Sequence, residues 1–421
     1  HYDNHSVIYN SDKWEDLLKN NEPQKEDYYP QLDDIWTIVF TSGTTGDPKG
    51  VVLDYRTIYL TKIIVESDVN PLGMDRNGNN SFFSYLPLNH IFERVVLEFQ
   101  CMRYGGTMSF VESLESFPKN LADVQPTTFA GVPRIYNKFK DKILEKMPQK
   151  RLNFLLNVPI ISSLIKKKIR KSLGWSNANA IVSGAAFLPQ ELIEWYGKLG
   201  INILNGYGMT ENCCVCSYLD TSTGEGKGSV GKPWDQVEIK IGENGEILNK
   251  SPYLLKEYYK NPDYTNEVLV DGWFNTGDKG HLDDNGYLHI TGRVKDIFKT
   301  SKGKYIEPHL IEEKFEKSNL FQQLCIVGLG LVQPILLAVP NEQALNDKEK
   351  TEESLKKILL DFNSTADGYK KVKKIILLSE DWTPENGLTT PTLKIKRAKI
   401  DEAFSSKYQN WYNATEEVLW E

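Results

Sequence analysis

A strand that leads directly into a turn of glycines and hydroxyl residues is the feature that most constrains how this chain folds. Residues 35–40 (IWTIVF) form a continuous apolar run, and residues 41–50 (TSGTTGDPKG) follow it without a break. Continuous apolar runs of this length are typical of strands that are covered on both faces in a parallel sheet. We therefore expect one strand at 35–40, a second strand at 51–53 and a loop between them.

The composition of that loop predicts an anion-binding site. Its three glycines let the backbone approach a ligand closely, its four hydroxyl residues and backbone N–H groups donate hydrogen bonds, and Lys49 adds a positive charge. The loop is not a Walker A motif, because Lys49 is followed by Gly50 rather than by Ser or Thr. This disfavours a nucleotide kinase or a GTPase. A plain turn is the alternative interpretation.

The chain length predicts two or three domains, since 421 residues exceed what one core usually supports. Strand-like runs alternate with helical stretches over residues 54–211, which predicts βαβ units. These strand-like runs are 81–86, 107–111, 180–183 and 201–204. Short strands and turns over 212–292 predict a small antiparallel subdomain, and helices near 307–317 and 350–362 indicate a separate α+β domain. The predicted fold class is α/β, with a large N-terminal domain of βαβ layers, that antiparallel subdomain and a small C-terminal α+β domain.

Charge and cysteine content limit the partners. The formal charge of −7, from 50 basic and 57 acidic side chains, gives no general attraction to nucleic acid. Five cysteines, three of them at Cys213, Cys214 and Cys216, do not suggest a disulfide framework, so we expect a reducing, cytoplasmic compartment. No second Cys or His cluster supports a zinc site. We interpret the trio as packing residues.

Two segments raise the question of a membrane. Residues 324–340 are apolar but short for a membrane span and are interrupted by Gly and Pro, so we predict two buried strands and a turn. Residues 160–173 (IISSLIKKKIRKSL) form a basic amphipathic helix, which can lie on the inner face of a membrane. We favour a surface helix whose apolar stripe packs on the domain and whose lysines face water.

The loop at 41–50 resembles the phosphate-binding signature of the adenylate-forming, or AMP-binding, enzymes. Further signatures of that family occur in order. Residues 205–212 (NGYGMTEN) are similar to the motif in which the aromatic residue stacks on adenine, the threonine bonds the α-phosphate and the acid holds magnesium. The resemblance therefore assigns the phosphate loop to Thr41, Ser42, Gly43, Thr44, Thr45, Gly46 and Lys49, and the second motif to Tyr207, Gly208, Thr210 and Glu211.

Three more segments resemble nucleotide-contacting and hinge motifs of the family. Residues 183–186 (SGAA) are similar to the stretch that lines the adenine edge, which implicates Gly184 and Ala185. Residues 271–280 (DGWFNTGDKG) are similar to the ribose-binding motif, where Asp278 would accept both ribose hydroxyls. Residues 291–308 resemble the interdomain hinge, with Arg293 near the ribose and phosphate and Lys295 at the pivot. Lys299 matches a second basic residue that some relatives use in the other half-reaction.

The C-terminal part of the chain carries a candidate catalytic lysine. Residues 391–397 (PTLKIKR) resemble the catalytic-lysine signature, which places Lys394 at the matching position and leaves Lys396 as the competitor. Most of the family has Gly before this lysine, whereas Leu393 stands here, as in long-chain acyl-coenzyme A synthetases. Residues 86–94 (LPLNHIFER) also resemble the acyl-pocket signature of that group, with His90 where the carboxylate is expected. The charges of Glu93 and Arg94 would then pair and point away from the pocket.

The resemblance implies a function. ATP, with magnesium, would activate a long-chain fatty acid to an acyl-adenylate, and coenzyme A would then take the acyl group and release AMP. It also implies an AMP-binding domain over 1–294 and a mobile C-terminal domain over 295–421. Relatives carry a longer stretch before the phosphate loop, so the chain is either a fragment or naturally shortened. The alternatives are a truncated nucleotide-binding relative without ligase activity and an enzyme for another carboxylic acid.

Overall fold

The computed structural model describes residues 16, 19–20, 22, 29–41, 48–67, 70–113, 115–318, 320–390 and 394–421. The largest element is a seven-stranded sheet, whose first five strands are parallel and whose last two are antiparallel. In spatial order its strands are β4 (Thr107–Phe110), β3 (Ser81–Ser84), β5 (Thr128–Gly131), β6 (Ala180–Ser183), β7 (Leu204–Tyr207), β8 (Ser217–Leu219) and β9 (Lys232–Pro233). The alternation of strands and helices over 54–211 is therefore confirmed.

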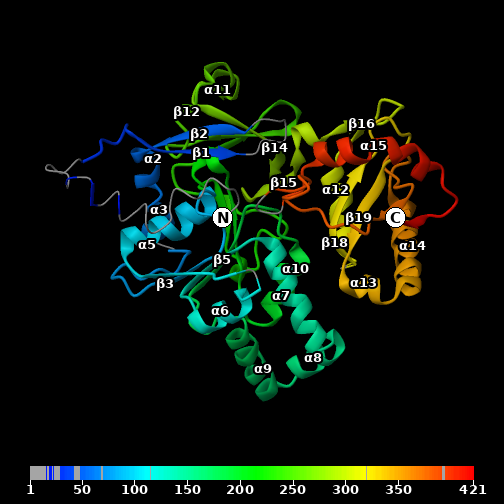
Figure 1. The fold of residues 1–421 in the computed structure, drawn as a ribbon, viewed down its shortest axis with the longest axis horizontal. Coiled ribbons are helices and arrows are strands. Elements are labelled where there is room, and N and C mark those ends of the chain that lie inside the picture. Colours follow the sequence, from blue (N-terminus) through cyan, green and yellow to red (C-terminus); the bar gives the residue numbers. More distant parts are fainter. Residues whose placement is uncertain are drawn as a thin grey trace.

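Helices cover this sheet because its strands are apolar on both faces. Phe83, Phe129 and Ile181 point into an aromatic cluster beneath the helices, whereas Phe82 and Val182 point into the core on the other face. The helices of this region are α4 (Ile91–Glu93), α5 (Phe99–Tyr104), α6 (Phe117–Val124), α7 (Pro133–Lys146), α8 (Gln149–Leu156), α9 (Pro159–Ser172) and α10 (Gln190–Lys198). A π-helical turn, η2 (Arg94–Glu98), joins α4 to α5. Figure 1 shows α8 and α9 at the lower edge of the molecule, beyond the sheet.

The strands on either side of the phosphate loop correct one expectation. β1 (Ile35–Thr41) and β2 (Lys49–Asp54) form an antiparallel hairpin, to which β12 (Glu257–Tyr258) adds a third strand. The expected parallel arrangement is wrong, because a connection of seven residues is too short for a parallel crossover. β1 is also not covered on both faces, since Ile35 is 51% and Phe40 61% exposed. Two short helices, α2 (Tyr55–Leu60) and α3 (Ile63–Glu66), follow β2.

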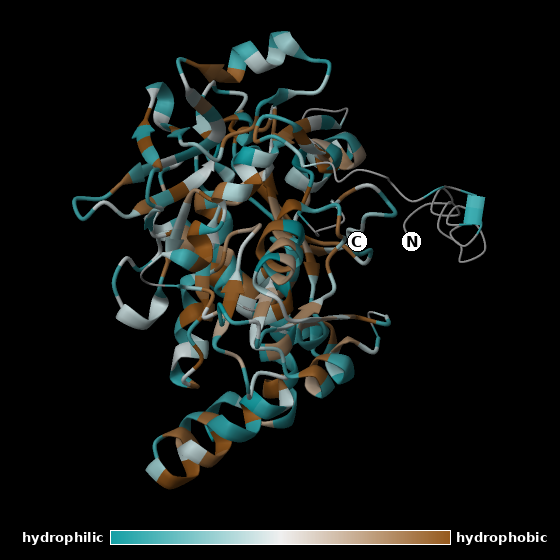
Figure 2. Cartoon of the chain, turned by 90° about the vertical axis from the view of Figure 1, so that its left-hand side faces the viewer, coloured by the Kyte–Doolittle hydropathy of each residue, from teal (hydrophilic) through white to brown (hydrophobic). Residues whose placement is uncertain are grey.

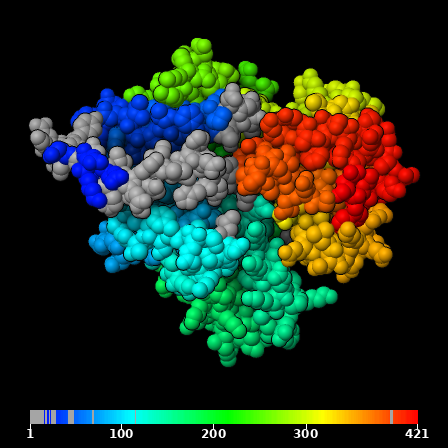
Figure 3. Space-filling view, in the orientation of Figure 1, coloured from blue at the N-terminus to red at the C-terminus, as the bar shows by residue number. Residues whose placement is uncertain are grey.

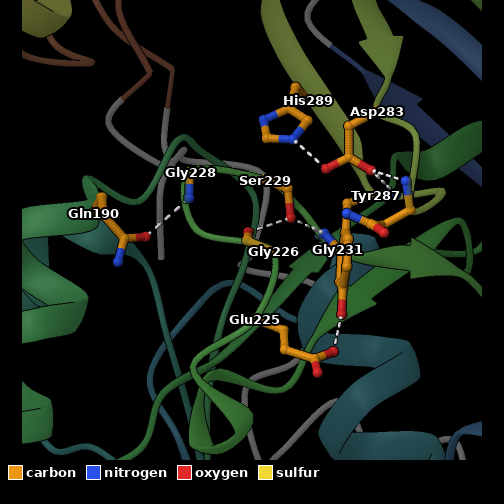
Figure 4. A network of polar contacts seen from close by, with 10 residues as sticks. Gln190, Glu225, Gly226, Gly228, Ser229, Gly231, Asp283, Tyr287 and His289 are labelled. Carbon is orange, nitrogen blue, oxygen red and sulfur yellow. Dashed lines mark hydrogen bonds and ion pairs between the residues drawn. The ribbon is translucent and has the colours of Figure 1, made fainter.

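An antiparallel subdomain follows the seven-stranded sheet, as predicted. It contains β10 (Glu238–Ile241), β11 (Glu246–Lys250), α11 (Pro262–Val268), β13 (Leu269–Val270), β14 (Trp273–Leu282) and β15 (Leu288–Arg293). The glycine-rich loop at 224–231 ties this subdomain to the rest of the domain (Figure 4). In that loop Glu225 accepts a hydrogen bond from the Tyr287 hydroxyl, and the Gly228 N–H donates to Gln190 on α10. Gly231 has a φ of 86°, and a side chain there would overlap the carbonyl oxygen of β8.

The C-terminal domain is a four-stranded sheet with helices on both faces. Its elements are β16 (Phe298–Lys299), β17 (Tyr305–Ile306), α12 (Pro308–Glu316), β18 (Phe321–Val327), β19 (Ile335–Pro340), α13 (Glu342–Asn346), α14 (Lys348–Thr365), β20 (Ile375–Leu377), α15 (Arg397–Asn413) and β21 (Val418–Trp420). β18 and β19 are the two buried strands predicted for the apolar run at 324–340. That run is continuous because alternate residues, such as Leu324 and Cys325, enter the two different cores of this sheet. Among the described residues, no helix has the length and apolar character needed to cross a membrane.

The two domains touch along α10, β15 and α12. Phe187 packs edge to face on His309, with ring centroids 4.8 Å apart, and Lys317 forms an ion pair of 2.9 Å with Glu191. In the space-filling view the orange and red C-terminal domain abuts the N-terminal domain on its right-hand side (Figure 3). This arrangement brings the loop after β20 toward the edge of the seven-stranded sheet.

Candidate active site

The candidate site lies at the carboxyl ends of the parallel strands. His90 follows β3, Ser183 ends β6 and Tyr207 ends β7. In open α/β sheets, ligands bind beyond the carboxyl ends of the strands, because the loops there converge. Chain segments far apart in the sequence therefore supply one site.

Tyr207, Asp278 and Arg293 form a connected polar group. The Tyr207 hydroxyl donates to Asp278 Oδ2 at 2.8 Å, and Arg293 Nε lies 3.0 Å from Asp278 Oδ1. The carboxylate and the tyrosine are buried, with exposures of 6% and 8%. Asp278 raises the pKa of the Arg293 guanidinium, which keeps its charge fixed. Because each carboxylate oxygen has a second lone pair, Asp278 can accept ribose hydroxyls while it keeps both protein partners.

Glu211 lies in a short 3₁₀ turn, η3 (Thr210–Asn212), directly after β7. Its Oε1 accepts a hydrogen bond of 2.7 Å from the Tyr258 hydroxyl on β12, which leaves the second oxygen available to a ligand. Tyr258 packs against Tyr264, and the ammonium of Lys49 lies 3.6 Å from the Tyr264 ring centroid. Neither tyrosine was predicted from the sequence, since no local pattern marks them and only the fold brings β12 next to η3.

Backbone strain concentrates around the same turn. Cys213 and Cys214 both have left-handed backbone angles, with φ of 49° and 62°, and Ala185 after β6 has φ of 68°. Non-glycine residues adopt such angles at a cost and are enriched at functional sites. Gly208 is required there, because a Cβ would lie 2.5 Å from the Cys214 backbone. The turn therefore packs directly against the strand that carries Tyr207.

The three neighbouring cysteines divide between core and site. Cys213 and Cys216 are fully buried in the core of the N-terminal domain, as predicted for packing residues. Cys214 is only partly buried, and it lies within electrostatic range of Lys394 and Glu211. All five cysteines are free thiols. Among the described residues, no group of three His, Cys, Asp or Glu side chains could hold a metal ion by itself.

Lys394 reaches the site from the C-terminal domain. Its own backbone is tied to Thr390, whose hydroxyl accepts from the Lys394 N–H at 3.1 Å. Lys394 is exposed to solvent and lies within electrostatic range of Arg293; loss of hydration, followed by repulsion from Arg293, lowers its pKa. Asp278 and Glu211 oppose this decrease. The candidate lysine and the two acidic residues of the N-terminal domain thus share one site.

His90 is the second group that the sequence placed near the substrate carboxylate. It caps α4, and its Nδ1 accepts a hydrogen bond of 3.3 Å from the Phe92 N–H. Burial, with a smaller contribution from Lys394, lowers the pKa of His90 to about 4. At neutral pH the imidazole is therefore uncharged and presents an Nε2 proton donor.

Glu93 and Arg94 do not pair, so that part of the expectation is wrong. Arg94 instead contacts Glu98, with 3.3 Å between Nε and Oε2, and lies over the Trp36 ring. Glu93 is fully buried, next to the Ser84 side chain and the Tyr85 backbone at the end of β3. Burial raises the pKa of Glu93 to about 8. This side chain is therefore a neutral carboxylic acid at pH 7.

The connection between the domains carries the predicted hinge. Lys295 lies in a short 3₁₀ turn (Val294–Asp296) after β15 and is exposed. The next residue, Asp296, lies 3.9 Å from Arg397, which also bonds Glu312 at 2.7 Å. Arg397 thereby links the hinge to α12 and to the start of α15. Lys299 points at the Tyr305 ring, with 4.8 Å between the ammonium and the ring centroid.

Only some of the predicted nucleotide-binding residues lie among the described residues. Thr41 and Lys49 flank the phosphate loop, whereas Ser42, Gly43, Thr44, Thr45 and Gly46 lie outside the described residues. Gly184 packs closely on Phe92, since an added Cβ would meet that ring at 3.1 Å. Thr210 is buried beside Glu211. The structure therefore brings His90, Tyr207, Glu211, Asp278, Arg293 and Lys394 into one region.

The donor set fits a magnesium–nucleotide complex better than a bare metal ion. Magnesium is usually held by one or two carboxylates together with phosphate oxygens and water. Glu211 supplies one such carboxylate oxygen, and Arg293 and Lys394 supply positive charge nearby.

Comparison with known proteins decides the family. The family model of the AMP-binding enzymes matches residues 2–259, and the model of the AMP-binding enzyme C-terminal domain matches residues 295–416. The chain belongs to the AMP-binding enzyme family. A curated relative of this AMP-binding enzyme, long-chain-fatty-acid–CoA ligase 5 of Rattus norvegicus, is 32% identical over 456 residues, which cover 96% of this chain and 65% of that protein. The chain thus spans less than two thirds of that relative.

Solved structures of adenylate-forming enzymes share the fold of this AMP-binding enzyme. The adenylation domain of a carboxylate reductase from Mycobacterium chelonae superposes with a TM-score of 0.75 at 22% identity, over 94% of this chain and 63% of that one. O-succinylbenzoate coenzyme A synthetase from Bacillus subtilis, in complex with ATP and magnesium ion, gives a TM-score of 0.67 at 22% identity, over 94% and 78%. Both matches support a large N-terminal domain followed by a smaller C-terminal domain.

Proposed function

We propose that this AMP-binding enzyme activates a long-chain fatty acid with ATP and transfers the acyl group to coenzyme A. In the first step a fatty carboxylate oxygen attacks the α-phosphate of ATP, which forms the acyl-adenylate and releases pyrophosphate. In the second step the thiol sulfur attacks the acyl carbon and AMP leaves. The observation that carries the proposal is the convergence of Lys394 with Glu211, Asp278 and Arg293.

Each residue of the site has a role suited to its surroundings. Asp278, held by Tyr207 and Arg293, would bind the ribose hydroxyls. Thr210 would donate to the α-phosphate, while Lys394 would neutralise the charge that develops there in the transition state. Magnesium bound at Glu211 would neutralise charge on the phosphate oxygens.

The other predicted contacts would act on the two ends of the substrates. Neutral His90 would donate a hydrogen bond from its Nε2–H group to the fatty carboxylate. This bond would orient the carboxylate, and the uncharged ring would not compete for the phosphates. Thr41, Lys49 and the loop between them would together bind the outer phosphates of ATP. Lys49 would have to leave the Tyr264 ring to do so, because its ammonium lies against that ring.

Two half-reactions at one site require the C-terminal domain to move. Lys394 would occupy the side of the α-phosphate from which a thiol would otherwise arrive, so we propose that residues 295–421 rotate about Lys295 between the steps. The ion pairs that hold this orientation are partly exposed, such as Lys317 with Glu191. Exposed pairs of this kind contribute little stability, so their exchange during rotation costs little.

A fatty acid is the favoured substrate for two reasons. The segment at 86–94 resembles the acyl-pocket signature of long-chain enzymes, and the curated relative from Rattus norvegicus is named a long-chain-fatty-acid–CoA ligase. Among the described residues near His90, the carboxyl group of Glu93 is buried and neutral, so it offers no charge to the ammonium of an amino acid. We place the activity in the cytoplasm, where five free thiols stay reduced.

Pyrophosphate release tests the proposal. The purified chain is incubated with ATP, magnesium and saturated acids of 2 to 18 carbons, with and without coenzyme A, and nucleotide products are separated. The proposal predicts AMP and pyrophosphate in equal amounts, with the highest kcat/KM for the long acids. ADP as the product, or ATP binding without turnover of any acid, would contradict it. Preference for a short acid would retain adenylation but refute the long-chain assignment.

A further inference from the structure

The α8–α9 hairpin projects from the N-terminal domain and exposes apolar side chains at its outer end. At the start of α9, Ile160 is 79% and Leu164 is 65% exposed, and Phe154 near the end of α8 is 70% exposed. Figure 2 shows hydrophobic residues at the end of the projection at the bottom of the molecule, and Figure 3 shows the same green segment protruding at the lower edge. The expectation that the apolar stripe of this helix packs on the domain is therefore only half right.

Exposure changes steadily along α9. Ile169 and Leu173, at the end nearest the domain, are buried, Ile165 is partly buried and Ile161 is 40% exposed. A surface helix of a soluble domain normally buries its apolar residues along its whole length. The first two turns of α9 therefore carry apolar surface that the rest of the described chain does not cover.

The same segment carries the opposite charge to the rest of the protein. Residues 147–174 contain seven basic side chains and no acidic one, although the whole chain has a net charge of −7. These basic residues are Lys150, Arg151, Lys166, Lys167, Lys168, Arg170 and Lys171. Among the described residues, no ion pair involves any of them. Arg170 donates to three backbone carbonyl oxygens of the domain, and the positive charge of the other six is available to an external partner.

The apolar and basic groups are ordered along one face of α9. Ile160, Leu164, Lys167, Lys168 and Lys171 lie on the same side of the helix, because they are spaced by three, four or seven residues. The rise of 1.5 Å per residue places Lys167 about 10 Å along the axis from Ile160. Interfacial helices bury their apolar groups roughly 5–10 Å into a bilayer while lysines remain among the headgroups.

We propose that the outer end of the α8–α9 hairpin docks on a lipid bilayer that contains anionic headgroups. Ile160, Leu164 and Phe154 enter the boundary between headgroups and acyl chains, and the lysines of α9 bind lipid phosphate and carboxylate groups. A second copy of this chain is a poorer partner, since it carries the same positive charge at the matching position.

Vesicle flotation tests this proposal without any substrate, so its outcome does not depend on ligase activity. The purified chain is mixed with vesicles of phosphatidylcholine alone or with 30% phosphatidylserine, at low and high salt. Binding is expected only with phosphatidylserine and is expected to weaken as salt screens the charges. The variant Ile160→Ser/Leu164→Ser is expected to reduce partitioning by at least about a hundredfold, because it removes the apolar groups that enter the bilayer.

The charge variant has a matched control on another helix. Lys167→Gln/Lys168→Gln is expected to reduce partitioning by roughly 30-fold, from about fivefold per lysine. Lys350→Gln/Lys357→Gln removes two exposed lysines from α14 and is expected to bind as the unmodified chain does. Leu360→Ser, at a residue that is 69% exposed on α14, is the corresponding apolar control.

Several results would overturn the proposal. Absence of binding to both vesicle types, equal binding to both, or unchanged binding of the two α9 variants would each do so. Sedimentation of the same samples without lipid identifies self-association. If the chain forms a dimer that Ile160→Ser/Leu164→Ser dissociates, the hairpin end is an interface between copies instead. Protection of the amides of residues 160–165 from hydrogen exchange by anionic vesicles alone would support the proposal directly.

Discussion

Replacement of Glu93 by glutamine is expected to change how the stability of the N-terminal domain depends on pH. Glu93 is completely buried, next to the Ser84 side chain and the Tyr85 backbone at the end of β3. Its pKa rises from 4.5 to about 8, chiefly because burial removes hydration; interactions with Ser84 and the Tyr85 backbone oppose the increase, and repulsion from Glu98 adds to it. Glutamine has nearly the same shape but cannot ionise, so Glu93→Gln isolates the cost of ionisation.

The sign and size follow from proton linkage. Between pH 4.5 and 8 the folded chain keeps a proton on Glu93 that the unfolded chain has lost, so the free energy of unfolding decreases as pH rises. The slope is about 1.4 kcal/mol per pH unit. Below pH 4.5 both states are protonated and this contribution to the slope disappears. Glu93→Gln lacks the slope, so it gains stability relative to the unmodified chain as pH rises through this window.

Thermal unfolding measures the difference. The melting temperature of Glu93→Gln minus that of the unmodified chain is expected to increase by about 3 °C per pH unit between pH 5.5 and 7.5. Glu66→Gln is the control without a slope: burial opposes the shift, but hydrogen bonds from Tyr104 and Lys62 lower the pKa of Glu66 below its usual 4.5, so this carboxylate is ionised in both the folded and the unfolded chain between pH 5.5 and 7.5. A difference for Glu93→Gln that is flat or decreases with pH would refute the assignment of a buried neutral carboxyl.

Three further predictions concern the site itself. Gly208→Ala is expected to destabilise the chain by about 1–3 kcal/mol and to weaken ATP binding, because its Cβ would lie 2.5 Å from the Cys214 backbone. In the same melting assay, the control Gly197→Ala, in the open interior of α10, is expected to leave stability unchanged or raised. Tyr258→Phe removes the hydrogen bond to Glu211 and is expected to raise the magnesium concentration needed for half-maximal pyrophosphate release by about tenfold. An unchanged magnesium titration would argue against metal binding at Glu211. His90→Asn is expected to lower kcat/KM without removing any step in the rate profile between pH 5.5 and 8, since the pKa of His90 is about 4; the loss of such a step would show that His90 titrates in that range.

Much of the fold was predictable because local patterns agreed with the topology. The strands at 81–84, 107–110 and 180–183 were predicted within one or two residues, since each is a short apolar run after a helix and before a turn. The expected strand at 201–204 is displaced to Leu204–Tyr207. Ile201 and Ile203 are buried without belonging to a strand, and an apolar pattern does not separate buried coil from a strand.

The site was predictable only where motifs identified residues one segment at a time. Tyr207, Asp278 and Arg293 were each predicted as nucleotide contacts, and the structure shows that they also contact one another. The contact of Tyr258 with Glu211 could not be predicted, because 47 residues separate them and the pairing depends on β12 joining the β1–β2 hairpin. The exposed end of α9 was missed for a similar reason. A periodic apolar stripe does not reveal how far along the helix the domain extends.

A separation of the two half-reactions tests the central claim that Lys394 acts on the α-phosphate. One single-turnover assay would follow adenylate formation from ATP and palmitate, and a second would follow the reaction of supplied palmitoyl-adenylate with coenzyme A. Both assays would be run on Lys394→Ala and on the neighbouring control Lys396→Ala. We expect Lys394→Ala to slow adenylate formation by about 10²–10³-fold, to leave thiolysis within about threefold, and Lys396→Ala to affect neither strongly. Equal loss of both half-reactions in Lys394→Ala, or a larger loss of adenylate formation in Lys396→Ala, would contradict the account.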